Sequence, residues 1–298
     1  MSLERLKKQL KQDLKQNQKL QKVTKSRNSL LTYGIIFLVL LSTVVFGYPR
    51  WQDYRSAEPQ RLLARGIKLE SLGRTTEALG DFQQVIARFP HEQVAPEALY
   101  RVARLWHFDL QDPQQALLTY LQLERDYPDN DHIQQAREAA ARIVKIDLGD
   151  DMQAIGYYQR LLETDQGKPD QYLYEIADSY FRLQNYPQAR IELENLLSTY
   201  PDSPLIPEVL HRKATILILE NRTEEANQDW QRLVDDFPES NYAARAHFNM
   251  AVLLEERGEL ELALESYRNL RDYPRPLLLE QRIDHLTRRI HNRNEGLE

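Results

Sequence analysis

An aromatic residue followed directly by proline recurs at the end of successive apolar helical segments of this chain. Five of the aromatic–proline pairs in the chain follow this pattern: Phe89-Pro90, Tyr127-Pro128, Tyr200-Pro201, Phe237-Pro238 and Tyr273-Pro274. Proline has no backbone N–H to continue a helix, and it disfavours helical geometry in the residue before it. Each pair therefore predicts the end of a helix. A chain divided at such regular intervals is predicted to consist of similar helical units.

Small residues recur in phase with these prolines. Each unit contains two, 12 or 13 residues apart: Gly66 and Ala78, Ala103 and Ala116, Ala141 and Ala154, Ala177 and Ala189, Ala214 and Ala226, Ala251 and Ala263. Four residues after the second small residue comes a large one: Phe82, Tyr120, Tyr158, Leu193, Trp230 and Tyr267. A small residue lets two helices approach closely, and the large side chain fills the space beside it. Each unit is therefore predicted to be a helix–turn–helix that covers its apolar face by stacking on its neighbours.

This pattern resembles the tetratricopeptide repeat (TPR) family over about residues 57–274. Successive second small residues lie 38, 38, 35, 37 and 37 residues apart, which exceeds the family's period of about 34. The extra residues are expected after the proline, as in residues 201–207. That longer link is similar to the TPR subclass of bacterial envelope proteins, including the outer-membrane-assembly lipoprotein and the cell-division coordinator. The resemblance implies an all-α, right-handed α-solenoid of about six helical hairpins.

Two places in the repeat region carry further expectations. The third copy has Gln166 where the others have proline, which predicts a hinge between two halves, Ala57–Asp165 and Gln166–Glu298. Residues 275–298 contain Leu279, Ile283, Leu286 and Ile290 at helical spacing between charged residues. This pattern predicts a C-terminal capping helix with a polar outer face.

The N-terminal part of the chain is basic and then apolar. Residues 1–28 hold nine Lys or Arg against two acidic residues, so the net charge of −6 comprises +7 for this arm and −13 for the rest. Residues 29–49 carry no charge, and about 20 apolar residues suffice to cross a membrane as a helix. One transmembrane helix is predicted over residues 29–49, followed by a linker over residues 50–56. The positive-inside rule then places the arm in the cytoplasm and the acidic body on the far side.

Alternatives to this interpretation remain open at the level of sequence. The apolar segment could be a cleaved signal peptide, although it is longer than the usual apolar core of about 7–15 residues. It could also be a buried core helix, or it could span a eukaryotic membrane with the acidic body outside. The basic arm has Leu3, Leu6, Leu10 and Leu14 at helical spacing, so it is either an amphipathic helix on anionic lipid or a solvated tail.

Motifs for catalysis are missing from the sequence. The chain has no cysteine, which excludes disulfides, thiolate nucleophiles and cysteine-based zinc sites. The seven histidines form no HExxH motif, and the glycines near residues 66–80 fall within a helical hairpin rather than a phosphate loop. The acidic body opposes binding to nucleic acid. The sequence therefore predicts a protein without enzyme activity, cofactor, metal or small-molecule substrate.

In the TPR family the first helix of each hairpin lines a groove that holds a partner protein. Mapped onto this chain, the resemblance implies these partner-binding residues: Tyr100, Arg104, His107, Arg142, Lys145, Tyr174, Asp178, Phe181, His211 and Phe248. Aromatic residues and Arg are the types that anchor interfaces. The alternative is that Tyr100, Tyr174 and Phe181 pack between adjacent hairpins. Binding of a chaperone's C-terminal tail is not supported, because the required asparagines are missing.

Together these patterns predict a membrane-anchored scaffold that binds other proteins in a cell envelope, in secretion, folding or assembly. The predicted location is a bacterial inner membrane, with a single span, a cytoplasmic N-terminus and periplasmic repeats. The alternative function is a structural component that associates with itself. Fold alone does not choose between them.

Overall fold

The computed structural model describes residues 41–42, 57–164, 167–270 and 273–295. The predicted basic arm, the linker and all but two residues of the predicted membrane span lie outside these described residues. Among the residues described, no helix has both the length and the apolar character needed to cross a membrane. The chain divides into two compact units, Met1–Ala95 and Pro96–Glu298.

The described residues of the first unit form one helical hairpin, made of α3 (Glu58–Ser71) and α4 (Thr75–Arg88). Gly66 is buried where the two helices cross, and a Cβ atom added there would lie 2.5 Å from Cε1 of Phe82. Only glycine allows this approach. Arg65 on α3 and Asp81 on α4 form an ion pair across the same hairpin.

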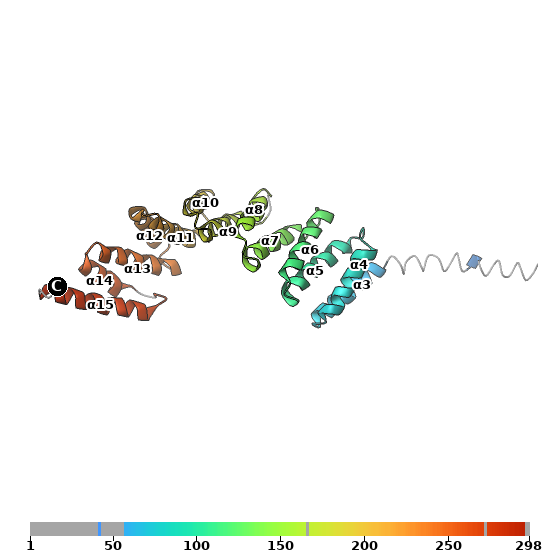
Figure 1. Ribbon diagram of the computed structural model, residues 1–298, viewed down its shortest axis with the longest axis horizontal. Helices are drawn as coiled ribbons and strands as arrows, with labels where there is room; N and C mark the ends of the chain where they lie inside the picture. The colour runs from blue at the N-terminus through green and yellow to red at the C-terminus, as the bar shows by residue number, and fades with distance from the viewer. Residues whose placement is uncertain (1–40, 43–56, 165–166, 271–272, 296–298) are drawn as a thin grey trace, which may run out of the picture. The chain divides into compact units, whose positions relative to one another are not determined.

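The hairpins of the second unit follow one another along the chain and are labelled in Figure 1. Their bounds are α5 (Val94–Arg104) with α6 (Pro113–Asp126), α7 (Ile133–Arg142) with α8 (Asp151–Leu162), α9 (Pro169–Arg182) with α10 (Tyr186–Thr199), α11 (Ile206–Leu219) with α12 (Thr223–Asp236), and α13 (Asn241–Glu256) with α14 (Leu260–Asn269). A last helix, α15 (Pro276–Asn294), follows them. The described residues thus form 13 α-helices and no strand, which confirms the predicted all-α series of hairpins.

Four of the five aromatic–proline pairs lie at helix ends, as predicted, whereas Tyr273-Pro274 lies in the segment between α14, which ends at Asn269, and α15. Phe89, Tyr127, Tyr200 and Phe237 are the residues that follow the last helical residue of α4, α6, α10 and α12, with φ between −126° and −141°. Each still donates its backbone N–H to the helix, to the carbonyl four residues earlier, at about 2.9–3.1 Å. The proline after it then directs the chain into the link to the next hairpin.

The repeated small and large residues form the core. Every one of the predicted alanines in both helices is at most 1% exposed, from Ala78 to Ala263. The six large residues that follow them are between 0% and 6% exposed. Spacing alone therefore predicted the contact face of every hairpin correctly.

Each hairpin turn contains one residue with positive φ. These residues are Gly73, Gln111, Gly149, Gln184, Asn221 and Gly258. They are spaced at the same intervals as the second small residues, so the turn has the same conformation in every copy. Glycine reaches this left-handed region freely, whereas Gln111 and Gln184 do so at a conformational cost.

Two first helices end in a π-helical segment: η2 (Leu105–Asp109) follows α5, and η3 (Ile143–Asp147) follows α7. Leu110 and Leu148 donate their backbone N–H to the carbonyls of Leu105 and Ile143, five residues earlier, at 2.9 and 3.0 Å. A π-helical turn accommodates one additional residue within a helix. These two hairpins are the ones whose small residues lie 13 rather than 12 apart. One of their extra residues is therefore inside the first helix, not after the proline as expected.

The predicted division into halves at residue 165 is wrong. One hydrophobic cluster joins Ala154, Tyr158 and Leu161 of α8 to Tyr172 and Ile176 of α9. A continuous core on both sides of the link holds these two hairpins together. The boundary between the compact units lies instead at Ala95 and Pro96.

The capping role expected of the C-terminal segment agrees with the position of α15. Leu286 is fully buried against the last hairpin, in a cluster with Ala263 and Tyr267. Leu279, Ile283 and Ile290 are partly buried against the same cluster. The rest of the helix is largely exposed, which leaves a polar outer surface at the end of the series.

We predict that Ala226→Leu lowers the free energy of unfolding by about 1–3 kcal/mol, the usual effect of overpacking. Ala226 is 0% exposed and belongs to the same cluster as Trp230, so added methyl groups have no free space. Urea unfolding followed by circular dichroism measures the change. The control is Ala87→Leu at an exposed site on α4, which should leave stability nearly unchanged. Equal stability of the two variants would contradict the packing described here.

Candidate partner-binding surface

The ten predicted partner-binding residues all lie on the first helices of their hairpins or on the π-helical segments that extend them. Their environments differ. Two are exposed arginines, several belong to a polar network, and the rest are packed aromatic rings. Only the first group presents unused binding capacity to solvent.

Arg104 and Arg142 are the exposed cations of this set. They occupy equivalent positions 38 residues apart, as the last residues of α5 and α7. Neither forms an ion pair with any described residue, although both lie near enough to the Tyr120 hydroxyl to favour its ionised form. Burial dominates at Tyr120 and raises the pKa of its hydroxyl. The two guanidinium groups are therefore available to another molecule.

One turn after each arginine comes a large exposed apolar residue that sequence reasoning missed. Phe108 is 60% exposed and Ile146 is 65% exposed. They too are 38 residues apart, within η2 and η3. The signal in the sequence was their fixed position four residues after Arg104 and Arg142. The sequence alone does not show that these residues are exposed, because a large apolar residue in a repeat is first expected to belong to the core.

His107 and Lys145 also occupy equivalent positions, but both are internal. His107 has a side chain 10% exposed, and its Nε2 lies 3.2 Å from Oδ2 of Asp147. Lys145 has a side chain only 4% exposed. Its ammonium donates to the backbone carbonyl and carboxylate of Glu175, at 3.1 and 2.5 Å, and lies 2.8 Å from Asp178. Lys145 is thus a buried ion-pair partner rather than a surface cation.

A polar network continues from Asp178 to the next first helix. Arg212 of α11 lies 3.2 Å from Oδ1 of Asp178 and donates to the Tyr174 hydroxyl at 3.3 Å. The Tyr174 hydroxyl donates to the Glu208 carboxylate at 2.5 Å. Burial, followed by this carboxylate, raises the pKa of Tyr174. Tyr174 and Asp178 therefore connect adjacent hairpins to each other.

The remaining aromatic residues are packed. The Phe181 ring lies against the guanidinium of Arg212, with 5.0 Å between Cζ and the ring centroid. Tyr100 stacks on His132 with ring centroids 4.5 Å apart. Phe248 is 7% exposed in the core and stacks on Tyr273 at 4.5 Å, so burial removes it from any partner-binding surface.

His211 of α11 is half-buried beside Tyr242 of the next hairpin, with ring centroids 5.4 Å apart. Burial lowers the pKa of His211 to about 4, and the nearby charges of Arg245 and Arg212 contribute in the same direction. Glu208 opposes this shift but does not outweigh it. The imidazole is therefore neutral in the folded protein near pH 7.

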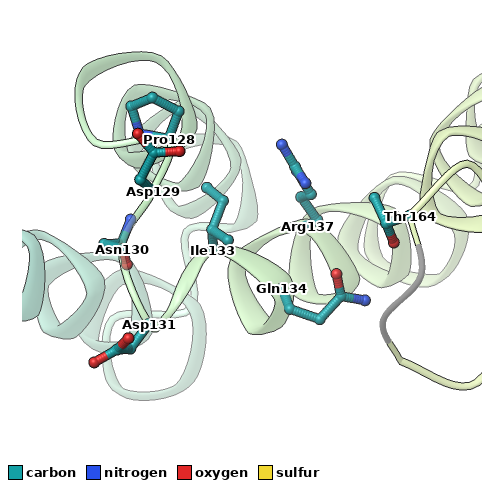
Figure 2. Close-up of a pocket in the computed structure, with 8 residues that line it drawn as sticks. All are labelled: Pro128, Asp129, Asn130, Asp131, Ile133, Gln134, Arg137 and Thr164. Carbon is teal, nitrogen blue, oxygen red and sulfur yellow. The ribbon is translucent and has the colours of Figure 1, made fainter.

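Two recesses adjoin this face or the links between hairpins. One, of ≈ 220 Å³, has Arg142, Ile146, Tyr158, Lys168 and Tyr172 among its lining residues. A larger one, of ≈ 630 Å³, is shown in Figure 2 between the link that follows α6, helix α7 and Thr164. Arg137 in the larger recess is already bound to Glu124 at 2.8 Å. In the described residues, no group of three His, Asp or Glu is placed to hold a metal ion.

Repeated helical hairpins that pack in series define the class of α-helical repeat proteins. Profiles of the tetratricopeptide repeat match residues 63–131 and 212–275, and a second TPR profile matches residues 171–203. These matches cover more than half of the chain, so the chain belongs to the TPR family. The unmatched stretch, residues 132–170, contains the third hairpin and Gln166.

Solved structures also resemble this chain. A complex described as Naa15/Naa10 bound to HypK-THB matches with a TM-score of 0.54 and 15% identity, over 80% of this chain and 35% of that one. A TPR protein from Parabacteroides merdae has a TM-score of 0.49 and 14% identity, over 77% and 99% of the two chains. YrrB, described as a TPR protein with an unusual peptide-binding site, has a TM-score of 0.47 and 16% identity, over 66% and 94%. A search of curated protein sequences finds no match.

We predict that Lys145→Met lowers the free energy of unfolding by about 2–4 kcal/mol. Methionine keeps most of the side-chain volume, so the loss comes from the carboxylates of Glu175 and Asp178 left without their ammonium. The effect stays below the upper range for buried pairs because Asp178 retains Arg212. Urea unfolding measures it. Lys168→Met, at an exposed lysine, is the control and should change stability by less than about 0.5 kcal/mol.

We predict that His211 makes the protein less stable as pH falls from 6.5 towards 4. The folded pKa of about 4 lies below the ordinary value of 6.5, so the unfolded chain takes up a proton first and is favoured in this window. Above pH 6.5 the imidazole is neutral in both states, so the full stability is present. Near pH 4 the free energy of unfolding is lower by about 1–2 kcal/mol, allowing for solvent around a half-buried ring. Thermal unfolding of His211→Phe should show a correspondingly shallower pH dependence. His285→Phe, at an exposed site on α15, should retain the wild-type dependence.

Proposed function

We propose that this chain is a membrane-anchored scaffold that holds a partner protein on the first helices of its second and third hairpins. The observation that carries the proposal is the repeated pair of an unpaired arginine and an exposed apolar side chain. Arg104 precedes Phe108, and Arg142 precedes Ile146, at equivalent positions of two hairpins. We name these four residues the Arg–apolar surface.

The chemistry of this surface suits protein binding. Arginine forms several hydrogen bonds and stacks on flat groups, and with aromatic residues it supplies most interface anchors. Exposed apolar side chains such as Phe108 and Ile146 are covered when a partner binds, and this burial drives association. TPR proteins are typically scaffolds for such interactions, which supports the same conclusion.

The proposed anchor is the uncharged segment over residues 29–49, preceded by the arm of charge +7. Its length suits one membrane crossing, and the charge asymmetry favours a cytoplasmic arm. We propose a bacterial inner membrane, with the repeats in the periplasm and a role in secretion, folding or envelope assembly. The anchor would keep the Arg–apolar surface close to the membrane, where envelope proteins emerge.

Photo-crosslinking in intact cells tests the scaffold function. A photoreactive phenylalanine analogue replaces Phe108 or Ile146, and in control variants Leu118 on α6 or Met152 on α8, which are 59% and 66% exposed on second helices. We expect a protein crosslinked from the first-helix positions and none from the controls. A crosslink between two copies of the chain would instead favour the self-associating alternative. No crosslink from either first-helix position would contradict the proposal.

The topology has its own test. Protease is added to cells in which only the outer barrier has been opened, and we expect it to digest residues 57–298. The arm should resist until detergent dissolves the membrane, because it lies on the cytoplasmic side. A cytoplasmic marker protein checks that the inner membrane is intact. Repeats that survive while the marker stays protected would show that the orientation is wrong.

A further inference from the structure

We infer that the Arg–apolar surface binds an acidic amphipathic segment of the partner, with carboxylates on Arg104 and Arg142 and apolar side chains on Phe108 and Ile146. This inference rests on the proposed function, because it names the chemistry of the partner at the same surface. Charge, exposure and the repeat register each support it.

Charge is the first argument. Outside the basic arm the chain has a net charge of −13, and the other cations on these first helices are already used. Arg101 binds Glu97 at 2.5 Å, and Lys145 is held between Glu175 and Asp178. Arg104 and Arg142 have no such ion pair among the described residues. Two unneutralised guanidinium groups on an acidic body select a partner that supplies carboxylates.

The second argument is that arginine and exposed apolar residue coincide in only two of the six hairpins described. The residues at the two equivalent positions are Ile67 and Ser71, Arg104 and Phe108, Arg142 and Ile146, Asp178 and Arg182, Thr215 and Leu219, and Val252 and Glu256. In the fourth hairpin the first position holds the acidic Asp178 instead of an arginine. Arg182, at the second position, is bound to Asp151 at 3.2 Å. Asp178 is itself paired with Lys145 and Arg212, so the fourth hairpin offers no available arginine at these positions, and an acidic partner is favoured on the second and third hairpins.

The recess beside Arg142 provides the third argument. Its carboxylates are already engaged: Glu138 accepts hydrogen bonds from Tyr172 and Gln134, and Glu175 is bound to Lys145. Its cations, Arg142 and Lys168, form no ion pair with described residues. The recess of ≈ 220 Å³ thus places Ile146 beside two cations, and the only carboxylate there without a cation partner among the described residues is Glu138, so one positive charge is in excess. An apolar side chain next to a carboxylate fits both features.

The test uses random 12-residue peptides displayed on phage and selected on the full chain in mild detergent. We expect the enriched peptides to combine Asp or Glu with large apolar residues. Fluorescence anisotropy then measures the affinity of the most enriched peptide, labelled with fluorescein. Arg104→Ala and Arg142→Ala should each weaken binding on the order of tenfold, as should Phe108→Ser and Ile146→Ser.

Matched controls are Arg160→Ala and Leu118→Ser, an arginine and an exposed leucine on the second helices of the same hairpins. They should leave affinity unchanged, and circular dichroism should show wild-type helix content in all variants because every site is exposed. The double variant Arg104→Glu with Arg142→Glu should shift selection towards peptides rich in Lys.

Three other outcomes would overturn the inference. Enriched peptides that are neutral or basic, yet compete with the crosslinked partner, would reject the acidic chemistry and leave the scaffold function standing. Acidic peptides that bind equally well after loss of both arginines would also reject it. No enriched peptide at all, together with no crosslink at Phe108 or Ile146, would reject the scaffold function as well.

Discussion

Close approach of two helices at small residues is the constraint on which each hairpin depends. Alanine at both positions brings the backbones together, and the large residue one turn later fills the remaining space. In the first hairpin this contact is so tight that Gly66 has no room for a Cβ atom beside Phe82. Because the helices have one closely packed arrangement, the residues on the opposite side of each first helix are presented in a defined direction. This fixed direction determines where the side chains of the polar network and of the Arg–apolar surface lie.

The π-helical segments change this presentation in two hairpins. Each of these two first helices accommodates one residue more than the first helices of the other hairpins. Leu105 at the start of η2 and Ile143 at the start of η3 nevertheless stay buried. The turn beyond still reaches the same left-handed conformation, at Gln111 and Gly149. The extra residue is therefore absorbed within the first helix, on the segment that carries Phe108 and Ile146. π-helical turns are frequent at functional sites, and among the described hairpins these are the two that have an arginine followed by an exposed apolar residue at the equivalent positions.

The sequence predicted what depends on local spacing: the helix ends, the buried small and large residues, and the capping segment. For the candidate surface, the sequence did not separate exposed residues from internal ones, because that difference depends on contacts with side chains far along the chain. Lys145 is internal because Glu175 and Asp178 lie beside it, and Phe248 is buried because Tyr273 covers it. No rule of spacing identifies such partners. The same limit explains why the π-helical turns were not foreseen, since a spacing of 13 equally permits a longer turn.

The buried polar contacts hold the proposed binding residues in place. On η2, His107 lies directly before Phe108 and contacts Asp147 of η3. On η3, Lys145 lies directly before Ile146 and is bound to α9 through Glu175 and Asp178. Each exposed apolar residue therefore follows a residue whose side chain is fixed to the next hairpin. A surface that is already ordered loses little conformational entropy when a partner binds, so more of the contact energy contributes to affinity. The two kinds of polar side chain on these segments thus have different roles: the internal His107 and Lys145 position the segment, and the exposed arginines remain available to a partner.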